Sequence, residues 1–293
     1  MSELDPTQFL GRQSHGLADA DAVVLPLPFE KTVSYGKGTA GGPRAIINAS
    51  LQVEFFDEEL RVDFEQRPRL HTVAPVKMGR LCARGYLGAV SRRVAGLRGK
   101  FLLALGGEHL VTWGVVKGLA EDPRRLTVVQ VDAHADLRDQ LEGVRWSHAT
   151  VMRRLRELGC RTVQIGIRAL SREEYELAEA DERIRIFYAY ELAERWKEVI
   201  RTLRSLKGDV FLTFDVDGLD ISVMPSTGTP MPGGLNWRQA MEVMRAVTTA
   251  RGCRLIGADV VEFVPSPRPP GCDIVAAQIA EKILAHWAAG RRR

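Results

Sequence analysis

The sequence predicts an α/β protein: a three-layer α/β/α sandwich in which helices cover both faces of a central, mostly parallel sheet of about eight strands. Two observations predict this fold. Short apolar runs rich in Val, Ile, Leu and Phe recur along the 293 residues, and amphipathic stretches lie between most of them. The apolar runs are continuous rather than alternating, which is typical of parallel strands that are buried on both faces.

The expected strands follow one another along the whole chain. They are AVVLPL (22–27), HTVAPV (71–76), FLLAL (101–105), LTVVQV (126–131), TVQIGI (162–167), RIRIFY (183–188), DVFLTF (209–214) and RLIGADVV (254–261). Between them, the amphipathic stretch ATVMRRLRELG (149–159) predicts a helix. NWRQAMEVMRAVTTARG (236–252) predicts another, because its apolar residues repeat with a helical period: Trp237, Ala240, Met241, Met244 and Val247.

The chain contains no Pro/Ser-rich linker, composition break or internal repeat, so we expect a single domain over residues 1–293. Two Gly/Pro-rich loops, SYGKGTAGGPRA (34–45) and MPSTGTPMPGG (224–234), lie between expected elements. Long loops inside a compact domain are more often functional than structural.

Composition and charge exclude several classes of protein. Hydrophobic residues make up 45% of the chain and charged residues 27%, which is ordinary for a soluble globular protein. The formal charge is +4, but no basic block with interleaved aromatic residues argues for nucleic-acid binding. No apolar run reaches the roughly 18 residues of a membrane span, and the N-terminus has no apolar core for export. The widely spaced cysteines favour reduced thiols in the cytoplasm: Cys82, Cys160, Cys253 and Cys272.

Ionisable residues follow one expected strand at alternate positions. VVQVDAHADL (128–137) places Asp132, His134 and Asp136 where the apolar run ends. In a parallel sheet this is the carboxyl edge, where ligands bind. Alternate spacing in an extended segment points all three side chains to one side. The alternative interpretation is a solvated acidic turn that happens to include a histidine.

Two more strands end in the same way. DVFLTFDVDGLD (209–220) places Asp215 and Asp217 at alternate positions, and FLLALGGEHL (101–110) ends in Glu108 and His109. Carboxylates brought together repel one another unless cations neutralise them. Oxygen and imidazole ligands without a thiolate favour Mn²⁺ or another hard divalent ion over structural zinc. About six ligands are too many for one open catalytic ion and suit two ions that share bridging carboxylates.

The set GGEH, DAHAD and FDVDGLD…TGTPMPGG resembles the ureohydrolases, the manganese-dependent arginase and agmatinase family. The likeness covers nearly the whole chain, including KTVSYGKGTAGGPRAI (31–46) and VVEFVPS (260–266). QIGIRALSREE (164–174) and SHATVMRR (147–154) resemble the agmatinase branch more than arginase. The resemblance implies an arginase/deacetylase-like fold, a homo-oligomer (trimer or hexamer), and two Mn²⁺ per subunit, with Ni²⁺ or Co²⁺ as alternatives. The implied metal ligands are His109, Asp132, His134, Asp136, Asp215 and Asp217, with Asp132 and Asp215 bridging.

The resemblance also implies a substrate and a mechanism. Four aspartates balance two divalent ions, and a bound hydroxide leaves the cluster at about −1, so the pocket should attract a cation. Glu262 would add a further negative charge and hold a guanidinium bidentately. A metal-bridging hydroxide would attack the guanidinium carbon. His148 would carry the proton to the departing nitrogen, although a helix-start histidine is the alternative interpretation.

The predicted activity is that of an agmatinase, which converts agmatine to putrescine and urea in polyamine biosynthesis. The same chemistry on guanidinobutyrate, guanidinopropionate, arginine or guanidine is the alternative. A metal-dependent deacetylase and a non-catalytic relative are the competing classes. We expect a small cationic guanidino substrate as the partner, and neither nucleic acid nor membrane.

The chain departs from the family pattern at three positions. Glu108 stands where the family usually has Asp, Ala149 where many members have Gly, and Ile221 where Pro is frequent. We expect Asp220 to stabilise its loop by accepting backbone N–H bonds rather than to bind metal. Arg168, at the end of a strand near the site, is interpreted as either a substrate neighbour or a subunit contact.

Overall fold

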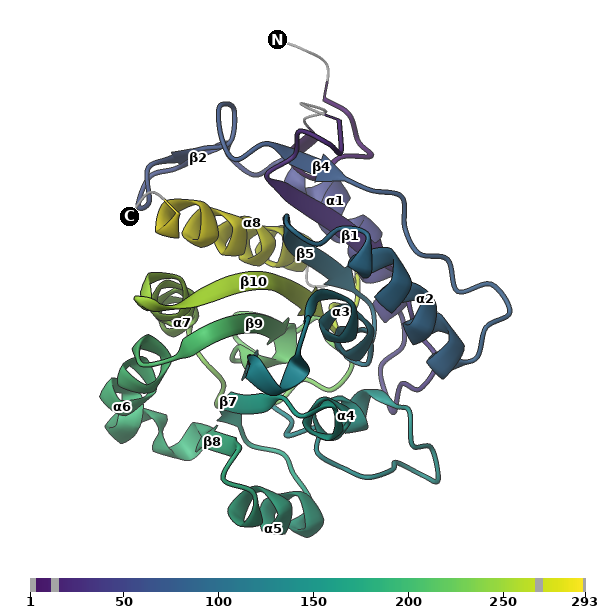
Figure 1. Cartoon of the computed structure of the whole chain (residues 1–293), viewed down its shortest axis with the longest axis vertical. Helices are drawn as coiled ribbons and strands as arrows, with labels where there is room; N and C mark the ends of the chain where they lie inside the picture. Colours follow the sequence, from purple (N-terminus) through teal and green to yellow (C-terminus); the bar gives the residue numbers. More distant parts are fainter. Residues whose placement is uncertain (1–3, 12–15, 267–270, 292–293) are drawn as a thin grey trace.

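A sheet of eight parallel strands lies at the centre of the protein (Figure 1). The computed structural model describes residues 4–11, 16–266 and 271–291. The strand order is β4-β1-β5-β10-β9-β6-β7-β8, and every pairing of these strands is parallel. A strand occurs at each of the eight predicted places: β1 Ala22–Leu27, β4 Leu70–Thr72, β5 Phe101–Gly106, β6 Leu126–Val131, β7 Arg161–Ile167, β8 Ile184–Tyr188, β9 Lys207–Asp215 and β10 Gly252–Val261. The strand expected over 71–76 is shorter than predicted, because β4 ends at Thr72, three residues before Pro75, which has no N–H to donate.

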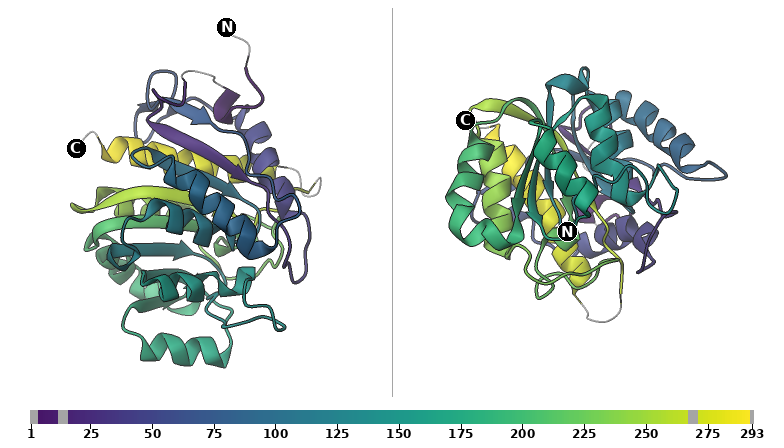
Figure 2. Two further views of the ribbon diagram at one scale, coloured as in Figure 1. Left: turned by 45° about the vertical axis from the view of Figure 1, so that its right-hand side comes forward. Right: turned by 90° about the horizontal axis from the view of Figure 1, so that it is seen from below.

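Helices cover both faces of the sheet, as predicted (Figure 2). One face packs against α1 Gly42–Ser50, α6 Leu192–Arg204, α7 Trp237–Thr249 and α8 Cys272–Gly290. The other packs against α2 Ala83–Ala95, α3 Val111–Leu119, α4 Val151–Leu158 and α5 Arg172–Ala180. The helices expected over 149–159 and 236–252 are therefore confirmed as α4 and α7.

Smaller elements connect these layers. A short antiparallel pair, β2 Phe56–Asp57 and β3 Val62–Asp63, lies outside the main sheet. Short 3-10 helices occur at Phe9–Gly11, Thr39–Gly41, Pro123–Arg125, His148–Thr150, Ala189–Glu191 and Val216–Gly218. The single domain predicted over residues 1–293 stays a prediction.

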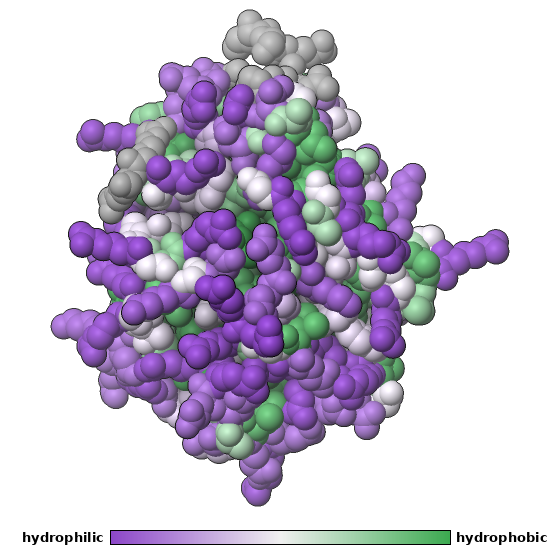
Figure 3. Space-filling view, in the orientation of Figure 1, coloured by the Kyte–Doolittle hydropathy of each residue, from purple (hydrophilic) through white to green (hydrophobic). Residues whose placement is uncertain are grey.

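Strand β5 shows why the apolar runs are continuous. Leu103 and Leu105 face one hydrophobic cluster, whereas Leu102 and Ala104 face the other. Successive side chains of a strand point to opposite faces, so both sets are buried when helices cover both faces. Each fully buried leucine stabilises the fold by about 1.5–3 kcal/mol through removal of apolar surface from water. The surface in Figure 3 is accordingly mostly hydrophilic, with only scattered hydrophobic areas.

The strand order brings the predicted motifs together. Strands β5, β10, β9 and β6 are consecutive neighbours, and their pairing extends to Leu105, Val260 and Phe214 at the carboxyl end. The segments that follow these strands therefore leave the same edge of the sheet side by side. Among the described helices, none has both the length and the apolar character that crossing a membrane requires.

Glu281 in α8 generates a prediction about stability. Its side chain is buried, and its Oε1 has no hydrogen-bond partner among the described residues. Burial raises the pKa of Glu281 to about 8. Because this folded-state pKa lies above that of an unfolded glutamate, the folded state binds the proton more tightly. The stability that this proton contributes is lost as the pH rises through about 8.

Glu281→Gln stays neutral at every pH and should escape this loss. We expect the stability of the variant relative to the wild type to increase by about 2–4 kcal/mol between pH 5 and pH 9. Urea denaturation of both proteins at the two pH values measures the difference. A difference that does not change with pH would contradict the assigned titration.

Candidate metal centre

The predicted site residues meet at the carboxyl edge of the four central strands. A pocket of about 190 Å³ opens there, lined by His109, His134, Asp136, His148, Asp215, Asp217 and Glu262 among others. Asp132 is fully buried and lies beside the lining residues His109, Asp136, His134 and Asp217. All eight side chains singled out from the sequence, six as metal ligands and two as catalytic groups, are therefore at one place in the fold.

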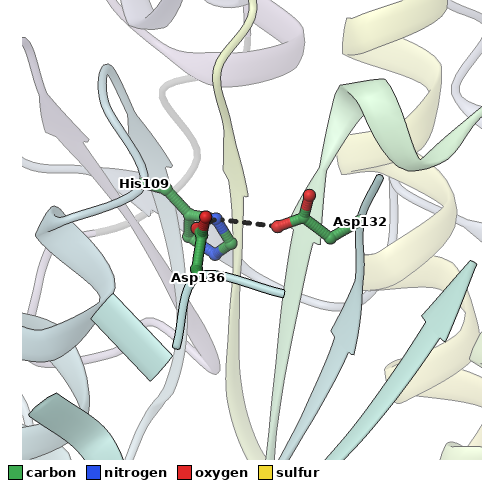
Figure 4. Close-up of side chains that lie close together, drawn as sticks. All are labelled: His109, Asp132 and Asp136. Atoms are coloured by element: carbon green, nitrogen blue, oxygen red, sulfur yellow. Dashed lines mark ion pairs between the residues drawn. The ribbon is translucent and has the colours of Figure 1, made fainter. Parts of the chain in front are cut away.

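The first group of donors surrounds the His109 imidazole (Figure 4). Its Nδ1 lies 3.0 Å from Asp132 Oδ2, 3.1 Å from Asp136 Oδ2 and 3.4 Å from Asp215 Oδ2. When Nδ1 carries no hydrogen, it is a buried nitrogen that has no hydrogen-bond partner among the described residues. Donor atoms that face a common point without bonding to one another are the arrangement that a cation requires.

The second group of donors contains His134, Asp217 and, again, Asp132. His134 Nδ1 lies 3.0 Å from Asp217 Oδ2 and 3.6 Å from Asp132 Oδ1. Asp132 thus directs one carboxylate oxygen to each group. In this arrangement Asp132 could be shared by two cations, and the bridging role that the family resemblance implies for it stays a prediction.

Asp215, the other predicted bridge, belongs to the first group by its distance to His109. Its second oxygen accepts the Asp217 backbone N–H at 2.9 Å. This hydrogen bond shapes the turn that brings Asp217 to the second group.

The electrostatics of the pocket favour bound cations. Burial raises the pKa of Asp136 to about 7, and the negative charge of Asp132 adds to the effect. Burial also raises the pKa of Asp215 well above its usual value, together with the charges of Asp217 and Asp132. Carboxylates in this position can all stay ionised only if positive charge compensates them.

The donor types fit divalent metal ions. The donors are carboxylate oxygens and imidazole nitrogens, and no cysteine is found among the described residues that line the pocket. Such donors favour hard divalent ions over structural zinc, which is usually held by thiolates. The two groups can hold two ions, with Asp132 shared between them.

Backbone strain positions two of the acidic residues. Asp136 and Glu262 have φ angles of 54° and 62°, in the left-handed region that non-glycine residues rarely adopt. Each conformation costs about 1–2 kcal/mol. The carbonyl oxygen of Asp136 accepts the backbone N–H groups of Met152 and Arg153 at the start of α4, and the Glu262 N–H donates to the Gly107 carbonyl oxygen. These bonds maintain the strained turns from which both carboxyl groups enter the pocket.

The glycine pair before Glu108 allows a close approach of two backbones. A Cβ atom on Gly107 would lie 2.0 Å from the carbonyl oxygen of Phe29. The Gly107 N–H donates to Leu27 and the Glu108 N–H to Phe29, at 3.0 and 2.9 Å. Any other residue at 107 would force apart the segments that follow β1 and β5.

Sequence reasoning missed two polar residues that orient the cluster. The Gln130 amide donates to Asp132 Oδ2 at 2.6 Å and to the His134 carbonyl oxygen at 3.2 Å. Thr213 Oγ1 lies 2.9 Å from His109 Nε2 and thereby fixes the ring. Both residues are polar, lie in otherwise apolar strands, and stand two positions before a predicted ligand. That spacing was the available signal, because it puts each on the same face of its strand as the ligand.

Asp220 and Arg168 organise the loop after β9. Asp220 accepts backbone N–H bonds from Ser222, Gly233 and Gly234 at 3.0, 2.7 and 3.3 Å, which confirms its predicted role. The Arg168 guanidinium donates to three carbonyl oxygens of the same region: Asp217 at 2.7 Å, Met231 at 2.8 Å and Leu219 at 3.3 Å. Arg168 therefore holds this loop in place through hydrogen bonds. This role differs from both predicted interpretations, a substrate neighbour and a subunit contact.

Glu262 and His148, the two predicted catalytic residues, line the same pocket as the donor groups. Glu262 Oε1 accepts the His109 backbone N–H at 2.6 Å, and burial raises the pKa of its carboxyl group well above the usual value. His148 begins a 3-10 helix, as its alternative interpretation stated, but its ring also lines the pocket. Burial lowers the pKa of His148 to about 4. Its imidazole is therefore neutral at pH 7.

Two of the three departures from the family pattern, Ala149 and Ile221, lie in different surroundings. Ala149 lines the pocket beside His148, and its carbonyl oxygen accepts the Arg138 N–H at 3.2 Å. Ile221 is exposed at the surface, and nothing in the structure explains why it replaces proline.

Comparisons with known proteins extend over nearly the whole chain. The model of the arginase family matches residues 20–286. An N(1)-aminopropylagmatine ureohydrolase of Synechocystis sp. is 38% identical over 98% of this chain and 96% of its own length. An agmatinase of Bacillus anthracis is 32% identical over 92% of both chains. The structure of agmatine ureohydrolase of Thermoplasma volcanium superposes with a TM-score of 0.83 at 25% identity, covering 100% of this chain and 96% of that one.

Asp136→Asn tests the first donor group. The variant keeps the size of the side chain but loses a negative charge and one good oxygen donor, so we expect metal content to fall from two ions per chain towards one. Elemental analysis after dialysis against Mn²⁺ measures it. Glu142→Gln, which neutralises an exposed carboxylate farther along the same loop, is the control and should keep both ions. Full metal occupancy in Asp136→Asn would refute this ligand assignment.

Proposed function

This chain belongs to the arginase family, and from that premise we propose that it hydrolyses the guanidino group of a small amine to release urea. The observation that carries the proposal is the pair of donor groups that share Asp132, beside a buried carboxylate, Glu262, in the same pocket. We propose His109, Asp132, His134, Asp136, Asp215 and Asp217 as ligands of two Mn²⁺ ions. Ni²⁺ and Co²⁺ suit the same donors.

The charge of the pocket supports a cationic substrate. The four aspartates balance two divalent cations, and the Glu262 carboxylate leaves an excess of negative charge. One oxygen of Glu262 already accepts the His109 N–H, which fixes the carboxylate plane against the backbone. A planar guanidinium matches a fixed carboxylate because its N–H donors form a rigid fork.

The reaction adds water to the guanidinium carbon and breaks one carbon–nitrogen bond. When bound, the two cations supply a water molecule whose pKa falls from about 15.7 to roughly 7, a nucleophile available near neutral pH. His148 is neutral, so it can take a proton from the nucleophile and then return it to the departing amine nitrogen. Glu262 keeps the guanidinium oriented during both transfers.

Two amines are candidates for the substrate. Agmatine is the compound expected from the sequence, and relatives named agmatinase support it. N1-aminopropylagmatine is favoured by the names of relatives at 38% and 34% identity. Both carry the guanidino group on a chain with a cationic nitrogen. Tyr35 lines the pocket and is 83% exposed, so its ring is free to contact such a cation.

Arg138 is the feature that would suit a guanidino acid instead, because it lines the pocket and could pair with a carboxylate tail. Its guanidinium, however, lies 3.6 Å from the carboxylate of the buried Glu174. This neighbour already compensates its charge, which favours the amines over guanidinobutyrate, guanidinopropionate and arginine.

The competing classes require a different site. A deacetylase would bind a single zinc ion, whereas a donor set with two groups and a shared carboxylate supports two ions. A non-catalytic relative would not need the complete set.

We further propose a cytoplasmic location, which is supported by four cysteines that form no disulfide. The homo-oligomer expected from the family resemblance stays a prediction.

Urea release by the purified, manganese-loaded protein tests the activity and the substrate together. The panel contains agmatine, N1-aminopropylagmatine, guanidinobutyrate, guanidinopropionate, arginine and guanidine. We expect the two amines to exceed the others in kcat/KM by at least about 10-fold, since the others lack the cationic tail or carry an opposite charge. Release of urea from none of the compounds, with two metal ions bound, would reject the proposed function.

His148→Ala tests the proton carrier. We expect turnover to fall by about 100-fold or more, the usual contribution of general acid–base catalysis, while both metal ions stay bound. His71→Ala, in β4 at the far edge of the sheet, controls for the loss of a histidine elsewhere and should turn over normally. If His148→Ala keeps most of its turnover, another group moves the proton.

A further inference from the structure

Glu108 is a buried carboxylate that the proposed mechanism does not use. It follows the glycine pair at the end of β5 and precedes the proposed ligand His109, yet its side chain contacts Lys31 and Thr32. It belongs to neither candidate metal group, and it is fully buried. Its hydrogen-bond partners lie in the loop that follows β1.

Three donors of that loop converge on the Glu108 carboxylate. Oε1 accepts the backbone N–H groups of Lys31 and Thr32. Oε2 accepts the hydroxyl group of Thr32. Burial raises the pKa of Glu108, but these three donated hydrogen bonds oppose that shift and favour the ionised carboxylate. The only hydrogen of the Thr32 hydroxyl group is therefore committed to Glu108.

The same hydroxyl oxygen faces His148. Thr32 Oγ1 accepts the His148 backbone N–H at 3.2 Å and lies 3.3 Å from its Nδ1. With the hydroxyl hydrogen directed at Glu108, this oxygen can only accept from the ring, so the contact favours the tautomer that carries the hydrogen on Nδ1. A neutral imidazole has one N–H, so Nε2 keeps its lone pair. Nε2 lies 3.0 Å from Ser34 Oγ, a hydroxyl group that can donate to it.

We propose that Glu108 is a positioning residue that acts through Thr32 to hold His148 in its Nδ1–H tautomer, with Nε2 as the nitrogen that takes up and returns the proton. The inference rests on the proposed function of His148. The order of donation runs in one direction, from Nδ1–H to Thr32 Oγ1 and from the Thr32 hydroxyl to Glu108. A carboxylate that holds a histidine in the right tautomer is known to matter strongly for turnover in hydrolases.

A purely structural role for Glu108 would have other consequences. The carboxylate would then only fasten the 31–34 loop to the end of β5, and any change that weakens this fastening would affect substrate binding and stability. A tautomer effect instead lowers kcat with little change in KM, and it depends on a hydroxyl group at position 32. The two roles can therefore be separated at Thr32, which is only partly buried.

Thr32→Val and Thr32→Ser form the matched pair. Valine keeps the shape of threonine but removes the oxygen, whereas serine keeps the oxygen and removes a methyl group. With the best substrate of the panel, we expect Thr32→Val to lower kcat by about 10- to 100-fold, the usual effect of losing an orienting partner, with KM and metal content nearly unchanged. Thr32→Ser should keep kcat within a few-fold of the wild type.

Glu108→Gln is the third variant. Its amide presents donors as well as an acceptor, so it can reverse the Thr32 hydroxyl group, which then donates towards Nδ1. We expect the same loss of kcat. If this buried substitution prevents folding, the threonine pair still decides the question.

The tautomer itself supplies a readout that does not depend on activity. In zinc-loaded protein labelled with [¹⁵N]histidine, the ring shifts of His148, assigned by their absence from His148→Ala, should report Nδ1–H in the wild type and in Thr32→Ser. Thr32→Val and Glu108→Gln should lose this preference.

An unchanged kcat in Thr32→Val, equal losses in the valine and serine variants, or an Nε2–H signal in the wild type would each overturn the inference. None of these results would affect urea release by the wild type. Conversely, a wild type that releases no urea from any compound rejects the proposed function, while the ring shifts still test whether Glu108 sets the tautomer.

Discussion

The repulsion between buried carboxylates is the constraint on which the rest of this structure depends. Four aspartates lie close together at the carboxyl edge of the sheet and are almost completely removed from water: Asp132, Asp136, Asp215 and Asp217. Burial and mutual charge raise the pKa of three of them, so the fold contains a site that is unfavourable unless positive charge enters it. The stability and the chemistry of the protein are therefore linked through the same residues.

The parallel sheet makes this concentration of charge possible. Neighbouring parallel strands end at the same edge, and the order β5-β10-β9-β6 places four such ends side by side. The strands bury mostly apolar side chains on both faces, and the proposed ligands come at or just after the ends of the hydrogen-bonded ladder. Left-handed turns at Asp136 and Glu262 then direct carboxyl groups inward, at a cost that the hydrogen bonds around each turn offset.

A layer of polar side chains surrounds the cluster and orients each donor. Gln130 contacts Asp132, Thr213 contacts His109, and Arg168 clamps the carbonyl oxygens of the loop that carries Asp217. Groups in this position control ring orientation and ligand basicity in metal sites. On the substrate side, Thr32 joins a buried glutamate to the ring of His148. Hydrogen bonds thus orient both the proposed metal ligands and His148, the proposed proton carrier.

The sequence by itself determined the eight strands, the layers and the gathering of the acidic motifs, because these depend on local patterns: apolar runs, helical periods and alternate spacing at strand ends. It also contained signals for Gln130 and Thr213, polar residues two positions before a predicted ligand. Only the tertiary structure decided that Arg168 clamps a loop and that Glu108 reaches His148 through Thr32. Thr32 lies 76 residues from Glu108 and 116 residues from His148 along the chain. Their contacts therefore follow from how the strands pack and leave no periodic pattern in the sequence.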